Sequence, residues 1–342
     1  MSERQIAIPS RQPSATSVDD TVLPFEVKAL DLRGRVVRLG PAVDTILRSH
    51  DYPAPVAKLL GEAVVLAVLL GNSLKFEGRF ILQTQGDGPV RMLVVDYTTP
   101  GKIRACARFD ADRVAAAIAA GKTDAGGLLG RGHLALTIDQ GPDMSRYQGL
   151  VALDGGSLED AAHEYFLRSE QIPTRIRLAV GEELSAAAGG AQHRWRAGGL
   201  LVQFLPSSPE RARQADLHPG DIPEGHPAQD SKPVVEDDAW VEAKALVDTI
   251  EDHELVDPDV SSERLLYRLF HERGVRVFGG QNVREACRCS RQRIMGMMRR
   301  FNQKDRHDMV GENGRIEVTC EFCSRKYDLD PAEVEAAVAE AR

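Results

Sequence analysis

Apolar and polar residues alternate in several short segments of the first two thirds of the chain. Three of these segments, at residues 79–85, 90–97 and 103–109, are separated by turns that contain glycine, aspartate or proline. Alternation with a period of two, bounded by such turns, is typical of half-buried strands. The pattern therefore predicts a meander of three strands.

Other segments show the same alternation. Residues 23–39 alternate around an Arg-Gly dipeptide at 33–34, which predicts a hairpin with its turn at that dipeptide. Residues 174–180 and 199–205 predict two more strands. The Ala/Gly-rich residues 186–192 between them are typical of a disordered stretch.

The longest apolar run extends from Val56 to Leu70 and is interrupted by a lysine, a glycine and a glutamate. It is too short for a membrane span, so it predicts a helix buried in a protein core. Strands and helices mix without a regular strand–helix–strand repeat. We therefore expect an α+β N-terminal domain with mixed sheets over residues 22–206.

Two segments differ from this pattern in composition. Residues 1–21 are polar and are expected to form a disordered N-terminal extension. Residues 206–233 contain six prolines among charged and small residues, which predicts a disordered linker or insert over 207–235.

Helical spacing returns after the linker, and we expect a helical middle segment over residues 236–280. Its apolar stripes are either packed against neighbouring elements or belong to a metastable segment that can be released. Residues of these stripes include Trp240, Leu265, Leu266, Leu269 and Phe270.

Composition excludes several classes of protein. A net charge of −8 argues against a protein that coats nucleic acid over its whole surface. Five cysteines, four of them close together in sequence, do not resemble a secreted disulfide framework. The first twenty residues lack the apolar core of a signal peptide, so we expect a cytoplasmic protein.

The four clustered cysteines form the pattern Cys287-x-Cys289, thirty residues, Cys320-x-x-Cys323. Two cysteine pairs at such a separation predict a tetrathiolate site for one zinc ion. The spacing does not distinguish a purely structural zinc site from a redox switch in which oxidation ejects the metal.

We expect a small zinc-binding domain over residues 281–330, followed by a final helix over 331–342. Residues 287–329 are too few for a core that is stable alone. Zinc could supply about 10–16 kcal/mol of apparent binding free energy, so removing it should unfold this small domain.

These features occur within a sequence that resembles the heat shock protein 33 kDa family of redox-regulated holdase chaperones. The resemblance extends from about Leu23 to Leu329. The stretches that carry it are RGRVVRLGPAVDTIL, HDYPAPVAKLLGEA, LKFEGRFILQTQGDGPVRMLVVDY, ARFD, LALTIDQGPDMSRYQGLVAL, YFLRSEQIPT, LLYRLFHERGVRVF, CRCSR and CEFC.

The resemblance implies an ATP-independent chaperone that is not an enzyme. In the reduced, inactive and monomeric form, one zinc ion would be bound by Cys287, Cys289, Cys320 and Cys323. Oxidants with mild unfolding stress would expel zinc and form disulfides between Cys287 and Cys289 and between Cys320 and Cys323. The zinc-binding redox-switch domain and the middle segment would then lose structure, and the protein would dimerise and hold unfolding clients. Candidates for the client-binding face are Trp240, Leu265, Leu266, Leu269 and Phe270. Neither a membrane nor a nucleic acid is expected as a partner.

Two other functions are consistent with parts of the sequence. The region from Cys287 to Tyr327 has ten Lys/Arg against five Asp/Glu, so a nucleic-acid-binding zinc module is one alternative. Its phosphate contacts would be Arg288, Arg291, Arg293, Arg299 and Arg300. A thiol-disulfide oxidoreductase that uses Cys320-x-x-Cys323 is the other. The fifth cysteine, Cys106, is expected to be a packing residue.

Overall fold

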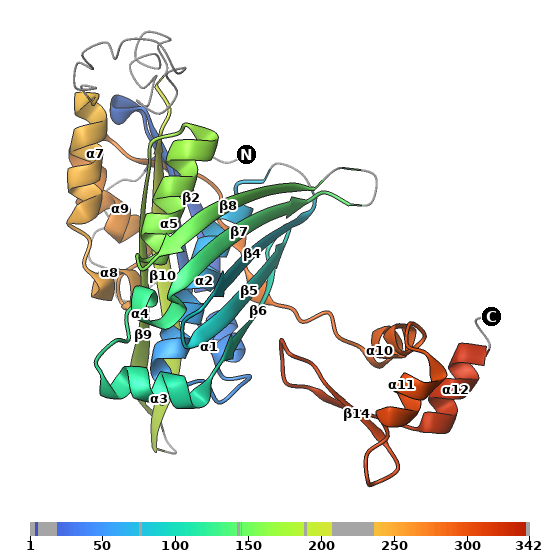
Figure 1. Ribbon diagram of the computed structural model, residues 1–342. Coiled ribbons are helices and arrows are strands. Elements are labelled where there is room, and N and C mark those ends of the chain that lie inside the picture. Colours follow the sequence, from blue (N-terminus) through green and yellow to red (C-terminus); the bar gives the residue numbers. More distant parts are fainter. Residues whose placement is uncertain are drawn as a thin grey trace, which may run out of the picture.

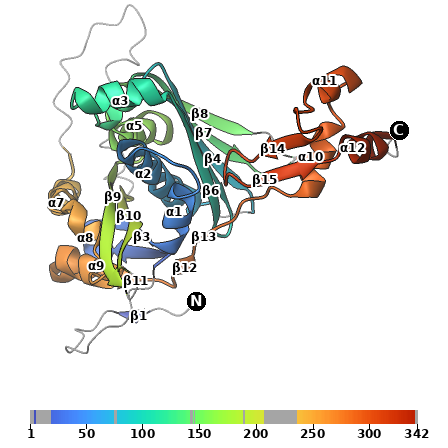
Figure 2. The same cartoon turned by 90° about the horizontal axis from the view of Figure 1, so that it is seen from below.

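The computed structural model describes residues 4–5, 19–74, 77–141, 144, 146–187, 190–206 and 236–339. Most of the expected N-terminal extension, 1–21, and the whole expected linker, 207–235, lie outside these residues. The described part contains two large sheets, helices on their faces, and a small C-terminal module (Figures 1 and 2). The boundaries of the expected segments remain predictions.

One sheet, here called sheet A, has seven antiparallel strands. In order of pairing they are β1 (Arg4–Gln5), β11 (Arg276–Val277), β2 (Thr21–Val27), β3 (Leu32–Leu39), β10 (Gly190–Phe204) and β9 (Thr174–Ala187), and β12 (Gln281–Asn282) also pairs with β2.

The other sheet, sheet B, has six strands and is mixed, because its first pair is parallel and the others are antiparallel. In order they are β13 (Arg284–Glu285), β6 (Lys102–Phe109), β5 (Val90–Thr98), β4 (Arg79–Gly86), β7 (Arg131–Asp139) and β8 (Tyr147–Asp154). The predicted meander is confirmed as β4, β5 and β6.

Helix α2 (Ala54–Gly71) lies between the two sheets and forms the main core with both (Figure 2). It is long and apolar enough to cross a membrane, but 78% of it is buried inside the protein, so it is a core helix as predicted. The other helices of this part are η1 (Lys28–Leu30), α1 (Pro41–Leu47), α3 (Ala111–Ala119), α4 (Ala125–Leu129), α5 (Leu158–Tyr165) and the π-helical turn η2 (Phe166–Glu170).

The face of sheet A that points away from α2 is also apolar. Three helices and a short turn cover it: α7 (Asp238–Asp248), α8 (Asp252–Val256), α9 (Ser262–Phe270) and η5 (His271–Arg273). Figure 1 shows them stacked along one side of the long β9–β10 hairpin. They form a second core with sheet A that is separate from the first.

The C-terminal module consists of short elements around a small core. They are α10 (Arg291–Met298), α11 (Gln303–Asp308), β14 (Ile316–Thr319), β15 (Lys326–Leu329) and α12 (Pro331–Ala339). Its buried apolar residues are Ile294, Met298, Ile316, Leu329 and Val334. A core of this size supplies little stability by itself.

Two predictions about strands were wrong. The turn of the first hairpin lies at residues 28–31, and Gly34 lies inside β3. A Cβ at Gly34 would lie 2.3 Å from Cζ of Phe25, so the glycine makes room for a ring rather than for a turn. Strands β9 and β10 also extend into the Ala/Gly-rich residues 186–192, which were expected to be disordered.

Carboxylates from three helices meet near the centre of α2. Burial raises the pKa of Glu62, and the carboxylates of Glu159 in α5 and Asp252 in α8 raise it further. Lys58 lowers it, and the resulting pKa is about 7. The folded protein therefore binds the Glu62 proton more tightly than the unfolded chain does. This contribution to stability is complete below the ordinary pKa of 4.5 and is lost as the pH rises through about 7.

We therefore expect Glu62→Gln to stabilise the protein at pH 8, by about 1–3 kcal/mol, and to have little effect at pH 4.5. Urea denaturation at both pH values measures the difference. Glu272→Gln, at an exposed position, is the control and should change neither value. An equal effect of Glu62→Gln at both pH values would contradict this account.

Candidate metal and redox centre

The four clustered cysteines lie on two loops of the C-terminal module. Cys287 and Cys289 follow β13 directly, and the backbone N–H of Cys287 donates to Glu285 over 2.8 Å. Cys320 and Cys323 form the turn between β14 and β15. That turn is tight, since the N–H of Ser324 donates to the carbonyl of Cys320 over 2.9 Å.

The four sulfur atoms converge, and all lie within 4.8 Å of one another. The Cys287–Cys320 distance between Sγ atoms is 3.6 Å and the Cys289–Cys323 distance is 3.4 Å. Zinc–sulfur bonds of about 2.3 Å place the sulfurs of a tetrahedral site about 3.8 Å apart. The donor set and its size therefore fit a tetrahedral metal of the zinc type.

The thiols of the cluster differ in how easily they lose a proton. Burial raises the pKa of the Cys289 thiol, but hydrogen bonds with Tyr327 and with the other cysteines outweigh it and lower this pKa to about 7. The Tyr327 hydroxyl donates to Cys289 Sγ over 3.1 Å. Burial raises the pKa of Cys287 and of Cys323. Thiols that resist ionising together need a cation to take up their charge.

Tyr327 was not singled out from the sequence. A tyrosine four residues after a Cys-x-x-Cys turn has no distinguishing signal in one sequence. Its role depends on the pairing of β14 with β15, which brings the hydroxyl back over the other cysteine pair.

The candidate client-binding residues are all buried, with 0–6% of their surface exposed. They lie in the second core, between the middle helices and sheet A, where Phe270 packs on Phe25 and Trp240 on Phe204 with ring centroids 5.8 and 6.0 Å apart. In this conformation they pack against neighbours, and a client could reach them only after the middle helices moved.

Polar contacts attach the middle helices to sheet A. The buried guanidinium of Arg38 donates to the carbonyl oxygens of Glu254 and Asp257, and Arg196 donates to that of Val256 over 2.7 Å. These carbonyls lie at the C-terminal end of α8, where a helix favours cations. Gly198 of β10 allows the close approach, since a Cβ there would lie 2.1 Å from the carbonyl oxygen of Leu255.

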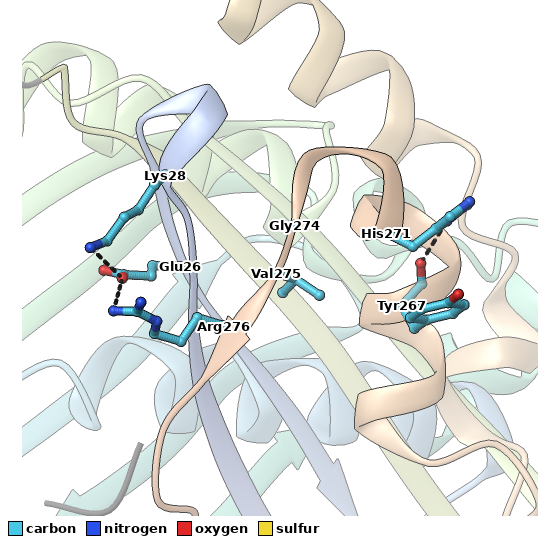
Figure 3. A pocket seen from close by; sticks show the side chains of 7 residues that line it. All are labelled: Glu26, Lys28, Tyr267, His271, Gly274, Val275 and Arg276. Carbon is cyan, nitrogen blue, oxygen red and sulfur yellow. Dashed lines mark hydrogen bonds and ion pairs between the residues drawn. The ribbon is translucent and has the colours of Figure 1, made fainter. Parts of the chain in front are cut away.

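A polar pocket of about 190 Å³ opens where α9 and η5 meet β2 (Figure 3). In it Glu26 pairs with Lys28 and with Arg276, at 3.8 and 3.3 Å. On the opposite side the rings of Tyr267 and His271 are stacked. The pocket marks the seam along which the middle helices meet the N-terminal strands.

The remaining candidate residues differ in their burial and in their hydrogen-bond partners. Cys106 is buried on sheet B and is not one of the four clustered cysteines. Of the arginines proposed to contact phosphate, Arg288 bonds to Asp96 and Arg291 bonds to Glu333. Arg293 donates to the carbonyl of Arg288 over 3.0 Å. Arg299 and Arg300 are exposed.

Comparison with known proteins identifies the family. The family model described as Hsp33 protein matches residues 20–330. The chain belongs to the Hsp33 family. It is 47% identical over 321 residues to the 33 kDa chaperonin of Caulobacter vibrioides strain NA1000, covering 93% of this chain and 97% of that protein. It is 34% identical to the 33 kDa chaperonin of Ectopseudomonas mendocina, with coverage of 89% and 90%.

A solved structure supports the fold independently. The Hsp33 homologue of Thermotoga maritima, a 33 kDa chaperonin, aligns with a TM-score of 0.67 at 20% identity, covering 94% of this chain and 99% of that one. As a member of the Hsp33 family with a four-cysteine cluster, the chain is a redox-regulated holdase and not an enzyme. The oxidoreductase alternative is therefore wrong.

Proposed function

We propose that Cys287, Cys289, Cys320 and Cys323 bind one zinc ion in the reduced protein, and that their oxidation releases the middle helices from sheet A. The observation that carries this proposal is the convergence of all four sulfurs within 4.8 Å. Bound zinc would hold the sulfurs as thiolates and cross-link the two loops of the module. The small apolar core of the module gives this cross-link a structural role.

Disulfide formation would rearrange the cluster. A disulfide bond is about 2.05 Å long, whereas the sulfurs of Cys289 and Cys323 are 3.4 Å apart and those of Cys287 and Cys320 are 3.6 Å apart. Each disulfide removes two electrons from two thiolates, and peroxide takes them up as it is reduced to water. Joining Cys287 to Cys289 and Cys320 to Cys323, as the family resemblance implies, leaves no thiolate for the metal.

The strand segments before Cys287 connect the cluster with the middle helices. Going back from the cysteine, β13 pairs with β6 of sheet B, and β12 and β11 both pair with β2 of sheet A. Each of these paired strands is short. Just after β13, the N–H of Ala286 donates to the carbonyl of Ile103 over 2.9 Å. If the module loosens, β13, β12 and β11 can therefore detach from their partner strands one after another, and α9 can then detach from sheet A.

Release would expose two apolar surfaces at once. One is the stripe of the middle helices that contains Trp240, Leu265, Leu266, Leu269 and Phe270. The other is the face of sheet A beneath it, lined by Phe25, Val27, Leu32, Val36, Leu200, Val202 and Phe204. Unfolding client proteins expose apolar side chains that fit such surfaces, and binding by burial of apolar area needs no ATP.

The same surfaces account for the expected change of oligomeric state. A monomer is expected while the middle helices cover sheet A, and a dimer once the apolar face is exposed. A reducing compartment is needed to keep the four thiols free, so we place the protein in the cytoplasm.

The direct test compares the reduced and the peroxide-treated protein in one aggregation assay. Chemically denatured citrate synthase is diluted into each, and light scattering is followed while a zinc indicator reports metal release. We expect suppression of aggregation only by the oxidised protein, with zinc release preceding it. Equal suppression by both forms would contradict redox control of client binding.

Zinc binding should depend on the cluster and not on the fifth cysteine. The apparent binding free energy of structural zinc, about 10–16 kcal/mol, is shared by four ligands, so we expect Cys289→Ser to weaken zinc binding by roughly 100-fold or more. Competition with a chelator under reducing conditions measures this. Cys106→Ser is the matched control and should bind zinc as the wild type does; equal affinity of all three proteins would place the metal elsewhere.

Gly198→Ala tests the release of the middle helices without any redox chemistry. The added Cβ would collide with the backbone of α8, so we expect α8 to lift from sheet A. The reduced variant should then suppress aggregation without oxidant, and protease should cut residues 236–280 faster. Gly296→Ala, which adds a Cβ that meets nothing within 4 Å, is the control. A reduced Gly198→Ala protein that is as inactive and protease-resistant as wild type would exclude this route.

A further inference from the structure

The outer face of sheet B carries an unusual group of charged residues where β5 lies beside β6. Side chains alternate along both strands, and Val95, Tyr97, Ile103 and Ala105 point into the main core. The intervening residues face the opposite side. On that side Asp96 is paired with Arg104 across the two strands.

Both cysteine pairs of the module contact this group through residues that lie between the cysteines. Arg288, between Cys287 and Cys289, forms a hydrogen bond to Oδ2 of Asp96. The guanidinium of Arg104 lies over the ring of Phe322, between Cys320 and Cys323, 3.9 Å from the ring centroid. Arg104 also donates to Oδ2 of Asp96 over 2.8 Å. One carboxylate oxygen thus joins the two loops of the cluster.

Burial makes this arrangement sensitive to the loss of a partner. Asp96 is only 5% exposed, and its other oxygen, Oδ1, is buried without a hydrogen-bond partner among the described residues. A buried carboxylate left with fewer cationic partners is strongly destabilised. By contrast, the nearby pair of Arg108 with Glu321 has side chains 60% and 59% exposed, and such surface pairs contribute little.

We propose that Asp96 and Arg104 are positioning residues that dock the four-cysteine module on sheet B and transmit the state of both cysteine pairs to the N-terminal sheets. Formation of a disulfide in either pair shifts the residue between its cysteines, Arg288 or Phe322, and removes a partner from the buried group. Undocking then frees β13, the first of the strands that connect to the middle helices. The docking contact is made by side chains that are not among the cysteines, whereas its response to oxidation rests on the proposed function.

The accessibility of the Cys106 thiol can be used to measure docking. It lies on β6 between Arg104 and Arg108, on the face that the module covers, and is only 4% exposed. Burial raises its pKa to about 11, and the carboxylate of Glu321 adds to the rise. The contacts of Arg104 with Phe322 and of Arg108 with Glu321, on either side of Cys106, place the module over this face. An undocked module should leave this thiol open to alkylating reagents.

The experiment measures alkylation of Cys106 by N-ethylmaleimide in the reduced full-length protein, resolved by peptide mass spectrometry. We expect Asp96→Asn to raise the rate about tenfold or more over wild type. Hydrogen exchange at the β13 amides of Arg284 and Ala286, which donate to β6 and its turn, should rise in parallel. Asp139→Asn is the matched control, because Asp139 is equally buried on sheet B but pairs with Arg79 and Arg146; its rate should stay within about twofold of wild type.

Phe322→Ala provides a second variant that leaves sheet B unchanged, in case Asp96→Asn does not fold. It should also raise both readouts. Wild-type rates of alkylation and exchange in the folded variants would overturn the docking role. Zinc content, measured on the same samples, reports separately on the proposed function: a wild-type protein that binds no zinc would contradict that function, while the alkylation comparison would still decide the docking role.

Discussion

Sheet A is apolar on both faces, and the rest of the structure depends on covering them. Helix α2 covers one face permanently, because it also forms the core with sheet B. Among the residues that the structure describes, the middle helices cover the other face. An apolar sheet face cannot remain exposed to water without binding something. A chaperone that is inactive when reduced therefore needs a cover that stays in place, and one that is activated by oxidation needs a cover that can leave.

The contacts beneath the middle helices suit a removable cover. Their apolar stripes supply the attraction, but Arg38 and Arg196 contribute hydrogen bonds to backbone carbonyls that water can replace. Helix α8 is only five residues long and approaches β10 at a position where glycine is required. A helix this short has little stability of its own and depends on its packing against β9 and β10. In the proposed mechanism, the module adds a remote constraint to this cover through β11, β12 and β13.

The sequence alone predicted the elements whose signals are local. The strands of the meander, the core helix α2 and each of the two cysteine pairs depend on neighbours within a few residues. The misplaced turn shows the limit, because Gly34 serves the ring of Phe25 rather than the local backbone. Asp96 was likewise invisible, since its partners Arg104 and Arg288 are brought together only by strand pairing and by the docking of a distant module.

The carboxylate of Asp96 connects the two cysteine pairs. Arg288 comes from one cysteine pair, and Arg104 links Asp96 to Phe322 of the other, so both loops converge on a single buried oxygen. Loss of the Cys287–Cys289 loop leaves Arg104 alone with the buried charge, and loss of the Cys320–Cys323 loop removes Phe322 from Arg104. If both pairs form disulfides as proposed, the two steps would be coupled through the N-terminal sheet as well as through the metal. Such coupling favours two states, docked and released, over a series of partly loosened ones.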